Sequence, residues 1–179
     1  MFIALSVALV WLIHFPIFPA AAFLEYDPAD IPIFITTFAF GPLAGLILTI
    51  IASIIQGFTV SAAGGVYGII MHIAATGTFV LVAGNIYRRK KTRGVAAIGL
   101  ICGAVSMTII MAAANLVITP LFLGTPVNAV IPMLLPVIVP FNLIKAGINS
   151  AVTFLLYKAV SRFIKGERSS GNVVPDSVH

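Results

Sequence analysis

The sequence predicts an all-α integral membrane protein built as a bundle of six transmembrane helices. Of its 179 residues, 60% are hydrophobic and only 8% are charged, whereas a soluble domain has about 25% charged residues. Apolar runs recur along the whole chain, and each spans or nearly spans a bilayer at about 20 residues of helix per crossing. We therefore predict one membrane domain over residues 1–168, followed by a polar, disordered tail over residues 169–179.

The helix boundaries follow from the prolines and glycines between the apolar runs. Pro16 ends the first helix, because proline cannot supply a helical backbone donor. Residues 20–22 resemble a signal cleavage site, but no Lys or Arg precedes that apolar run, so we expect it to be retained. Pro120 is expected to stop the fifth helix, and prolines at residues 132–140 to separate a short outer segment from the sixth. The expected helices cover residues 1–15, 29–40, 43–58, 66–87, 95–118 and 141–163.

Charged residues are segregated, and their placement predicts the orientation of the helices. Five basic residues lie within residues 88–93 and four more within residues 158–168, which indicates two cytoplasmic segments by the positive-inside rule. Glu25, Asp27 and Asp30 gather in the first long loop, which is expected to face outward. Six crossings then place both termini in the cytoplasm of a multi-pass protein of the bacterial cytoplasmic membrane. The net charge of +5 resides in these flanking segments, so no nucleic-acid partner is predicted.

Lys145 is the only charged residue deep within an apolar span, and it predicts a buried site for a small molecule. A lysine at membrane depth costs roughly 2.5 to 3.5 kcal/mol on insertion scales and is usually retained for function. Spacings of three and four residues place Asn142, Lys145 and Asn149 on one helical face. In the alternative interpretation, Lys145 extends to the outer headgroups and the asparagines only bond neighbouring helices.

Further polar residues leave alternatives open. Asn115 and His72 lie in apolar spans, where each could either bond a neighbouring helix or face a ligand. The first loop, around Leu24 and Asp27, suits a lid over a binding site, but Asp30 could equally cap the following helix. No pair of histidines has metal-ligand spacing, so no metal site is predicted.

Enzyme signatures are missing from the sequence. We find no serine with a plausible histidine and aspartate at one depth, no phosphate-binding glycine loop and no paired intramembrane carboxylates. The prediction is a protein that is not an enzyme, has no cofactor and depends on another subunit for energy.

Three segments resemble the substrate-binding S components of energy-coupling factor (ECF) vitamin transporters, and within them the riboflavin-specific branch. They are Leu-Glu-Tyr-Asp-Pro-Ala-Asp-Ile-Pro at residues 24–32, Thr-Phe-Ala-Phe-Gly-Pro-Leu-Ala-Gly at residues 37–45, and Pro-Phe-Asn-Leu-Ile-Lys at residues 140–145. The Phe-Gly-Pro turn is shared with other S components. The acidic loop together with Pro-Phe-Asn-x-x-Lys is more specific for the flavin branch, and the resemblance extends from the first helix to Lys165.

This resemblance implies a six-helix bundle that holds one vitamin near its outer face and docks on a transmembrane scaffold (T) subunit driven by two ATPases. The small-residue motif that packs on the scaffold corresponds to Ala4 and Ala8. His72 stands where the family pattern leads us to expect an asparagine. The predicted substrate-binding residues are Leu24, Asp27, His72, Asn115, Asn142, Lys145 and Asn149.

The leading hypothesis is therefore an S component in the lipid bilayer that captures riboflavin outside the cell for ATP-driven uptake. The related flavin mononucleotide is a second candidate ligand. The alternatives are an S component for another vitamin or precursor, and a membrane assembly subunit whose polar face only joins helices.

Overall fold

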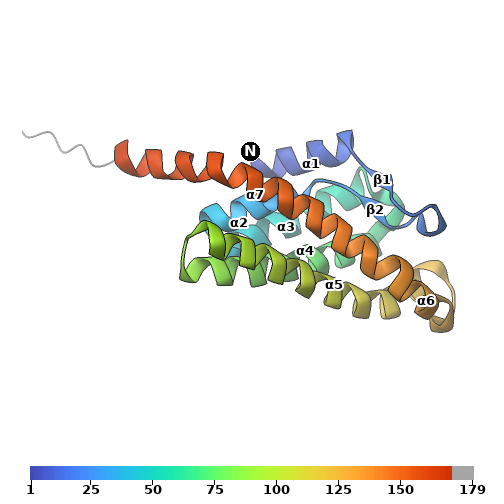
Figure 1. Cartoon of the computed structure of the whole chain (residues 1–179). Coiled ribbons are helices and arrows are strands. Elements are labelled where there is room, and N and C mark those ends of the chain that lie inside the picture. Colours follow the sequence, from blue (N-terminus) through green and yellow to red (C-terminus); the bar gives the residue numbers. More distant parts are fainter. Residues whose placement is uncertain (171–179) are drawn as a thin grey trace, which may run out of the picture.

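The computed structural model describes the backbone of residues 1–170 and the side chains of residues 1–19 and 21–156. Residues 171–179, which make up most of the predicted tail, lie outside the described residues. Most of the described chain is helical (Figure 1).

Long helices dominate the architecture, as the apolar runs predict. When the last continuous helical run is counted once, the described residues form six α-helical segments. They are α1 (Phe2–Leu12), α2 (Asp30–Phe40), α3 (Pro42–Phe58), α4 (Gly65–Arg89), α5 (Arg93–Leu123), and α6 (Val127–Met133) with the π-helical segment η3 (Leu134–Ile138) and α7 (Val139–Ser170). Short 3-10 turns lie at Pro19–Ala21 (η1) and Ala62–Gly64 (η2).

Two predicted boundaries at prolines are wrong. Helix α5 continues through Pro120 to Leu123 and ends where Gly124 adopts a left-handed conformation with φ 63°. The prolines between residues 132 and 140 do not separate an outer segment, because α6, η3 and α7 follow one another without a break. A π-helical turn widens the backbone locally, which lets the run accommodate prolines that lack a backbone donor.

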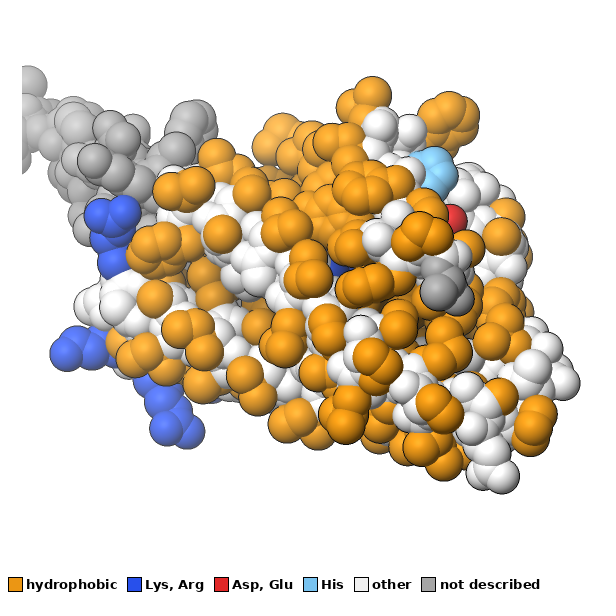
Figure 2. Space-filling model, turned by 45° about the vertical axis from the view of Figure 1, so that its right-hand side comes forward, with side chains coloured by type: hydrophobic (Ala, Val, Ile, Leu, Met, Phe, Trp, Pro, Cys, Tyr) orange, Lys and Arg blue, Asp and Glu red, His pale blue; other side chains and the backbone are white. Residues whose placement is uncertain are grey.

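The composition of the helices suits a lipid environment. Three helical runs, Ala62–Arg89, Arg93–Leu123 and Val127–Leu156, are long and apolar enough to cross a membrane, whereas α1, α2 and α3 are shorter apolar helices. Figure 2 shows hydrophobic side chains over most of one face of the molecule, with Lys and Arg side chains gathered at one end. An apolar surface of this extent is typical of a protein solvated by lipid chains.

Close helix contacts form the core between α2, α3, α4 and α5. The rings of Phe34 and Phe79 stack with centroids 3.7 Å apart. A Cβ atom on Gly45 would overlap the Thr37 side chain, and one on Gly99 would lie 3.0 Å from the Ala83 carbonyl oxygen. Glycine at these two positions therefore allows the close backbone approach that stabilises helix pairs in lipid.

The segment between α1 and α2, residues 13–29, folds over one end of the bundle, and we call it the lid. Its two short strands, β1 (Phe15–Pro16) and β2 (Glu25–Tyr26), pair antiparallel, with Phe15 opposite Tyr26. Helix α7 packs against both α2 and α5, so its polar face lies close to the place where the lid joins α2.

Candidate substrate-binding site under the lid

A cavity of about 410 Å³ lies between the lid and helices α3, α4, α5 and α7. Sites for small molecules typically measure about 300 to 1,000 Å³ and combine apolar walls with a few fixed polar groups. This cavity has that character, with methionine and phenylalanine side chains beside hydrogen-bonding groups. Its lining includes Leu24, Glu25, Asp27, Ser53, Gln56, His72, Met107, Met111, Thr119, Phe141, Asn142 and Lys145.

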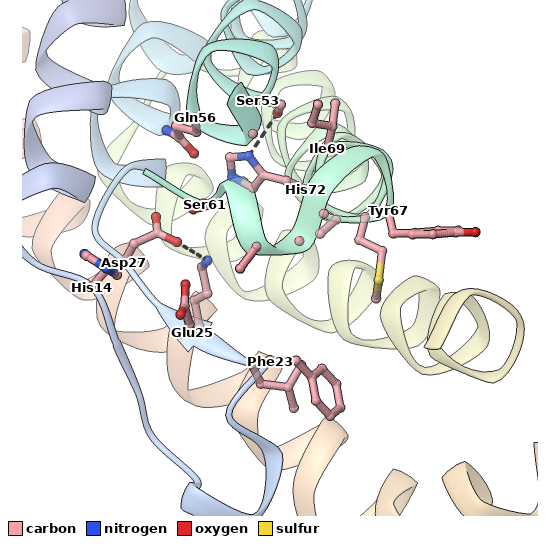
Figure 3. A pocket seen from close by; sticks show the side chains of 18 of the residues that line it. His14, Phe23, Glu25, Asp27, Ser53, Gln56, Ser61, Tyr67, Ile69 and His72 are labelled. Atoms are coloured by element: carbon pink, nitrogen blue, oxygen red, sulfur yellow. Dashed lines mark hydrogen bonds and ion pairs between the residues drawn. The ribbon is translucent and has the colours of Figure 1, made fainter. Parts of the chain in front are cut away.

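Lys145 is held inside the protein by the lid. Its Nζ atom donates to Asp27 Oδ2 at 2.6 Å, and the two side chains are only 10% and 13% exposed. The other oxygen of Asp27 accepts a hydrogen bond from the Ala29 backbone N–H at 3.0 Å. Lys145 therefore lies in the cavity wall, paired with a carboxylate (dashed in Figure 3), and does not extend to the headgroups as the alternative interpretation required.

Asn149, one turn further along α7, fastens the lid to α2. Its side-chain nitrogen donates to the Asp27 backbone oxygen at 3.1 Å and to Asp30 Oδ2 at 3.2 Å. Its oxygen accepts from the Tyr26 hydroxyl at 3.1 Å. Burial, together with the charge of Asp27, raises the pKa of Tyr26, which keeps this hydroxyl protonated as a donor. Asn149 shares the predicted face of α7 with Lys145, but it lies behind the cavity and not in its lining.

Asp30 is the centre of a buried polar network. Its side chain is fully buried and accepts hydrogen bonds from three others: His72 Nε2 at 3.2 Å, Thr76 Oγ1 at 2.8 Å and Asn149 Nδ2 at 3.2 Å. Helix α2 has no side-chain cap, so Asp30 does not cap it. The carboxylate instead joins α2 to α4 and α7, because buried charges need such partners.

His72 lines the cavity and is held on both sides by protein groups. Besides its contact with Asp30, its Nδ1 atom lies 2.9 Å from Ser53 Oγ, and Ser53 donates to the Thr49 backbone oxygen at 2.6 Å. The sequence led us to expect no serine with a histidine and an aspartate at one depth. That expectation is wrong, because Ser53, His72 and Asp30 lie together. Asp30 and Ser53 together fix the orientation of the imidazole ring at the cavity wall, and Figure 3 shows the contact with Ser53.

Gln56 is a cavity residue that the sequence reasoning missed. The side chain is 5% exposed, and its amide nitrogen is buried with no hydrogen-bond partner among the described residues. Thr49, Ser53 and Gln56 follow one another at spacings of four and three residues, which place them on one face of α3. The same argument that grouped the polar residues of α7 would have found Gln56.

The two remaining predicted asparagines differ in position. Asn142 lines the cavity and donates to the Ile138 backbone oxygen at 2.8 Å, which leaves its side-chain oxygen available to a ligand. Asn115 is fully buried and turns to its own helix, donating to the Met111 backbone oxygen and accepting from Thr119, both at 2.7 Å. Thr119, and not Asn115, reaches the cavity lining.

The predicted docking residues lie on the outer side of α1. Ala4 and Ala8 are exposed, whereas Ser6 and Val10 face the bundle and are buried. The Ser6 hydroxyl donates to the Ala29 backbone oxygen at 2.9 Å, which fixes the rotation of α1. Ala4 and Ala8 are thus exposed, together with larger side chains such as Leu5 and Trp11.

The helical bundle, the apolar exterior and the cavity under a lid together define a membrane protein of the substrate-binding class. The family model for "ECF transporter, substrate-specific component" matches residues 1–157. The chain therefore belongs to the substrate-specific (S) components of ECF transporters, and the family resemblance seen in the sequence is confirmed.

Similar proteins include two curated transporters. The "Riboflavin transporter RibU" of Staphylococcus aureus (strain TCH60) is 31% identical over 159 residues, covering 86% of this chain and 83% of that protein. The "Riboflavin transporter FmnP" of Bacillus subtilis (strain 168) is 29% identical over 174 residues, covering 92% of each. A solved structure titled "Structure and mechanism of the S component of a bacterial ECF transporter" superposes with a TM-score of 0.79 at 30% identity, over 92% of this chain and 94% of that one. The predicted fold class is confirmed.

Proposed function

We propose that this chain captures riboflavin in the cavity under the lid and delivers it for ATP-driven uptake with a T subunit and two ATPases. The observation that carries the proposal is the cavity of about 410 Å³ in an S component whose relatives are named riboflavin transporters. A flat ring system with a hydroxylated tail needs apolar walls and a few fixed hydrogen-bonding groups.

The lining residues suit both parts of such a ligand. Met107, Met111 and Phe141 offer apolar and polarisable surface to the ring. Asn142 and Lys145 supply hydrogen-bonding groups for its carbonyl or hydroxyl oxygens. Because riboflavin is neutral, Lys145 contributes a donor, while its charge is balanced by Asp27.

The proposed orientation places the lid at the outer surface of the cell membrane and both termini in the cytoplasm. The basic residues 88–93 support it, since they lie between α4 and α5 and Lys and Arg favour the cytoplasmic side. In this orientation Ala4 and Ala8 meet the T subunit, and uptake draws its energy from the ATPases.

A transport assay separates this proposal from its alternatives. Cells that cannot make riboflavin are given this chain with a T subunit and two ATPases, and the uptake of labelled riboflavin is measured. We expect uptake that needs the chain and that stops when the ATPases carry an inactivating substitution. Uptake of another vitamin instead would support the alternative S component, and the absence of any vitamin uptake or binding would support an assembly subunit.

A further inference from the structure

The charges around the cavity are not balanced. Lys145 is the only Lys or Arg among the described residues that line it, and its charge is already paired with Asp27 at 2.6 Å. Glu25 also lines the cavity, and its carboxylate has no hydrogen bond or ion pair among the described residues. The lining therefore carries one uncompensated negative charge when its histidines are neutral.

Glu25 lies in β2 and Asp27 directly follows that strand, and both residues line the cavity. Figure 3 shows the labelled carboxylates of Glu25 and Asp27, with a dashed line drawn from Asp27 and none from Glu25; the partner of Asp27 is Lys145. Behind His72, the buried carboxylate of Asp30 adds a further negative charge.

The positive groups elsewhere do not offset this excess. The basic residues 88–93 connect the far ends of α4 and α5, and Figure 2 shows Lys and Arg side chains gathered at one end. The uncapped first turn of α4, near Gly64 and Gly68 in the lining, supplies about half a positive charge at most. His14 and His72, also in the lining, add positive charge only when protonated.

Building on the function proposed above, we infer that Glu25 is a specificity-determining residue that makes the cavity select the neutral vitamin over its phosphomonoester. A phosphate group brings a charge of about −1.5 to −2 at pH 7. In a cavity that the lid partly covers, its repulsion by an unpaired carboxylate is screened less than on an open surface. Lys145 has donors left for a phosphate oxygen while it stays bonded to Asp27, but its single positive charge would then face the phosphate as well as Asp27.

A charge series at Glu25 tests the inference. Dissociation constants of riboflavin and of flavin mononucleotide are measured for the purified wild-type protein, Glu25→Asp, Glu25→Gln and Glu25→Lys, by quenching of flavin fluorescence. The readout is the dissociation constant of flavin mononucleotide divided by that of riboflavin within each variant. A general change in affinity cancels in this ratio. We expect the wild type and Glu25→Asp to prefer riboflavin, Glu25→Gln to lower the ratio about tenfold, and Glu25→Lys to lower it further.

A ratio that stays the same in Glu25→Gln, or a wild type that prefers the phosphomonoester, would overturn the inference and leave the proposed function intact. A wild-type protein that binds neither flavin would overturn both. A Glu25→Asp variant that loses the preference would show that side-chain length, and not charge, sets the selectivity.

Discussion

The Lys145 ammonium group and the Asp27 carboxylate lie 2.6 Å apart and join α7 to the lid across 118 residues of sequence. Each group is largely removed from water, so each depends on the other for its charge balance. Removing one partner of a buried pair leaves an uncompensated charge, which costs more than the pair itself contributes.

We predict that Asp27→Asn destabilises the ligand-free protein by about 3 kcal/mol, because it leaves Lys145 unpaired. Thermal unfolding in detergent measures this loss. The double variant Asp27→Asn with Lys145→Met should recover part of it, and Lys91→Met in the exposed basic loop serves as the control. A double variant that is less stable than Asp27→Asn alone would contradict the assigned ion pair.

A second prediction concerns the buried carboxylate of Asp30. Asp30→Asn should lower the free energy of unfolding by about 2 to 3 kcal/mol, because an amide cannot accept from three donors in the same way as a carboxylate. Thr76→Val, which removes one of these donors, should cost only about 1 kcal/mol. Equal melting temperatures for Asp30→Asn and the wild type would show that the network does not support the fold.

A substitution at Gln56 is expected to affect ligand binding and stability in opposite ways. Gln56→Leu removes a buried amide nitrogen that has no partner among the described residues, and such a group costs about 1 to 3 kcal/mol. The variant should therefore be at least as stable as the wild type without ligand, yet bind riboflavin about tenfold more weakly. Unfolding and flavin titration measure the two effects. Lower stability with unchanged affinity would assign Gln56 to packing alone.

The exposed face of α1 is predicted to act in docking. Ala8→Trp, and likewise Ala4→Trp, should leave riboflavin binding to the purified protein intact and abolish uptake, because a large side chain prevents close helix packing. Ile109→Trp on the exposed face of α5 is the matched control and should retain uptake. If Ala8→Trp destroys binding as well, α1 belongs to the binding site and the docking face is wrongly placed.

Local periodicity predicted much of the fold and one side of the site. The apolar runs predicted the helices, and the spacing of Asn142, Lys145 and Asn149 placed them on one buried face, which the structure confirms. The helix ends at prolines were less predictable, since a π-helical turn can absorb residues that usually break a helix.

Contacts between distant segments could not be predicted from spacing. Nothing in the sequence near Lys145 indicates that its partner is Asp27, or that His72 joins Asp30 to Ser53, because these pairs form only when separate helices pack. For Asn115, the sequence predicted a polar contact but not its partner. Its position in an apolar span predicted a polar contact, but the backbone of its own helix satisfies it, and Thr119 reaches the cavity instead.

The most direct test of the account is a titration of riboflavin into the purified protein, followed by quenching of flavin fluorescence. The wild type should bind saturably at one site, and Lys145→Ala should bind at least about tenfold more weakly, since a charged donor contributes about 1.5 to 3 kcal/mol. Asn142→Leu, which keeps Lys145 and Asp27 paired, should also weaken binding. It serves as the control for a folding defect that loss of the ion pair could cause in Lys145→Ala. No saturable binding by the wild type, or unchanged binding by both variants, would contradict the claim that this cavity holds the vitamin.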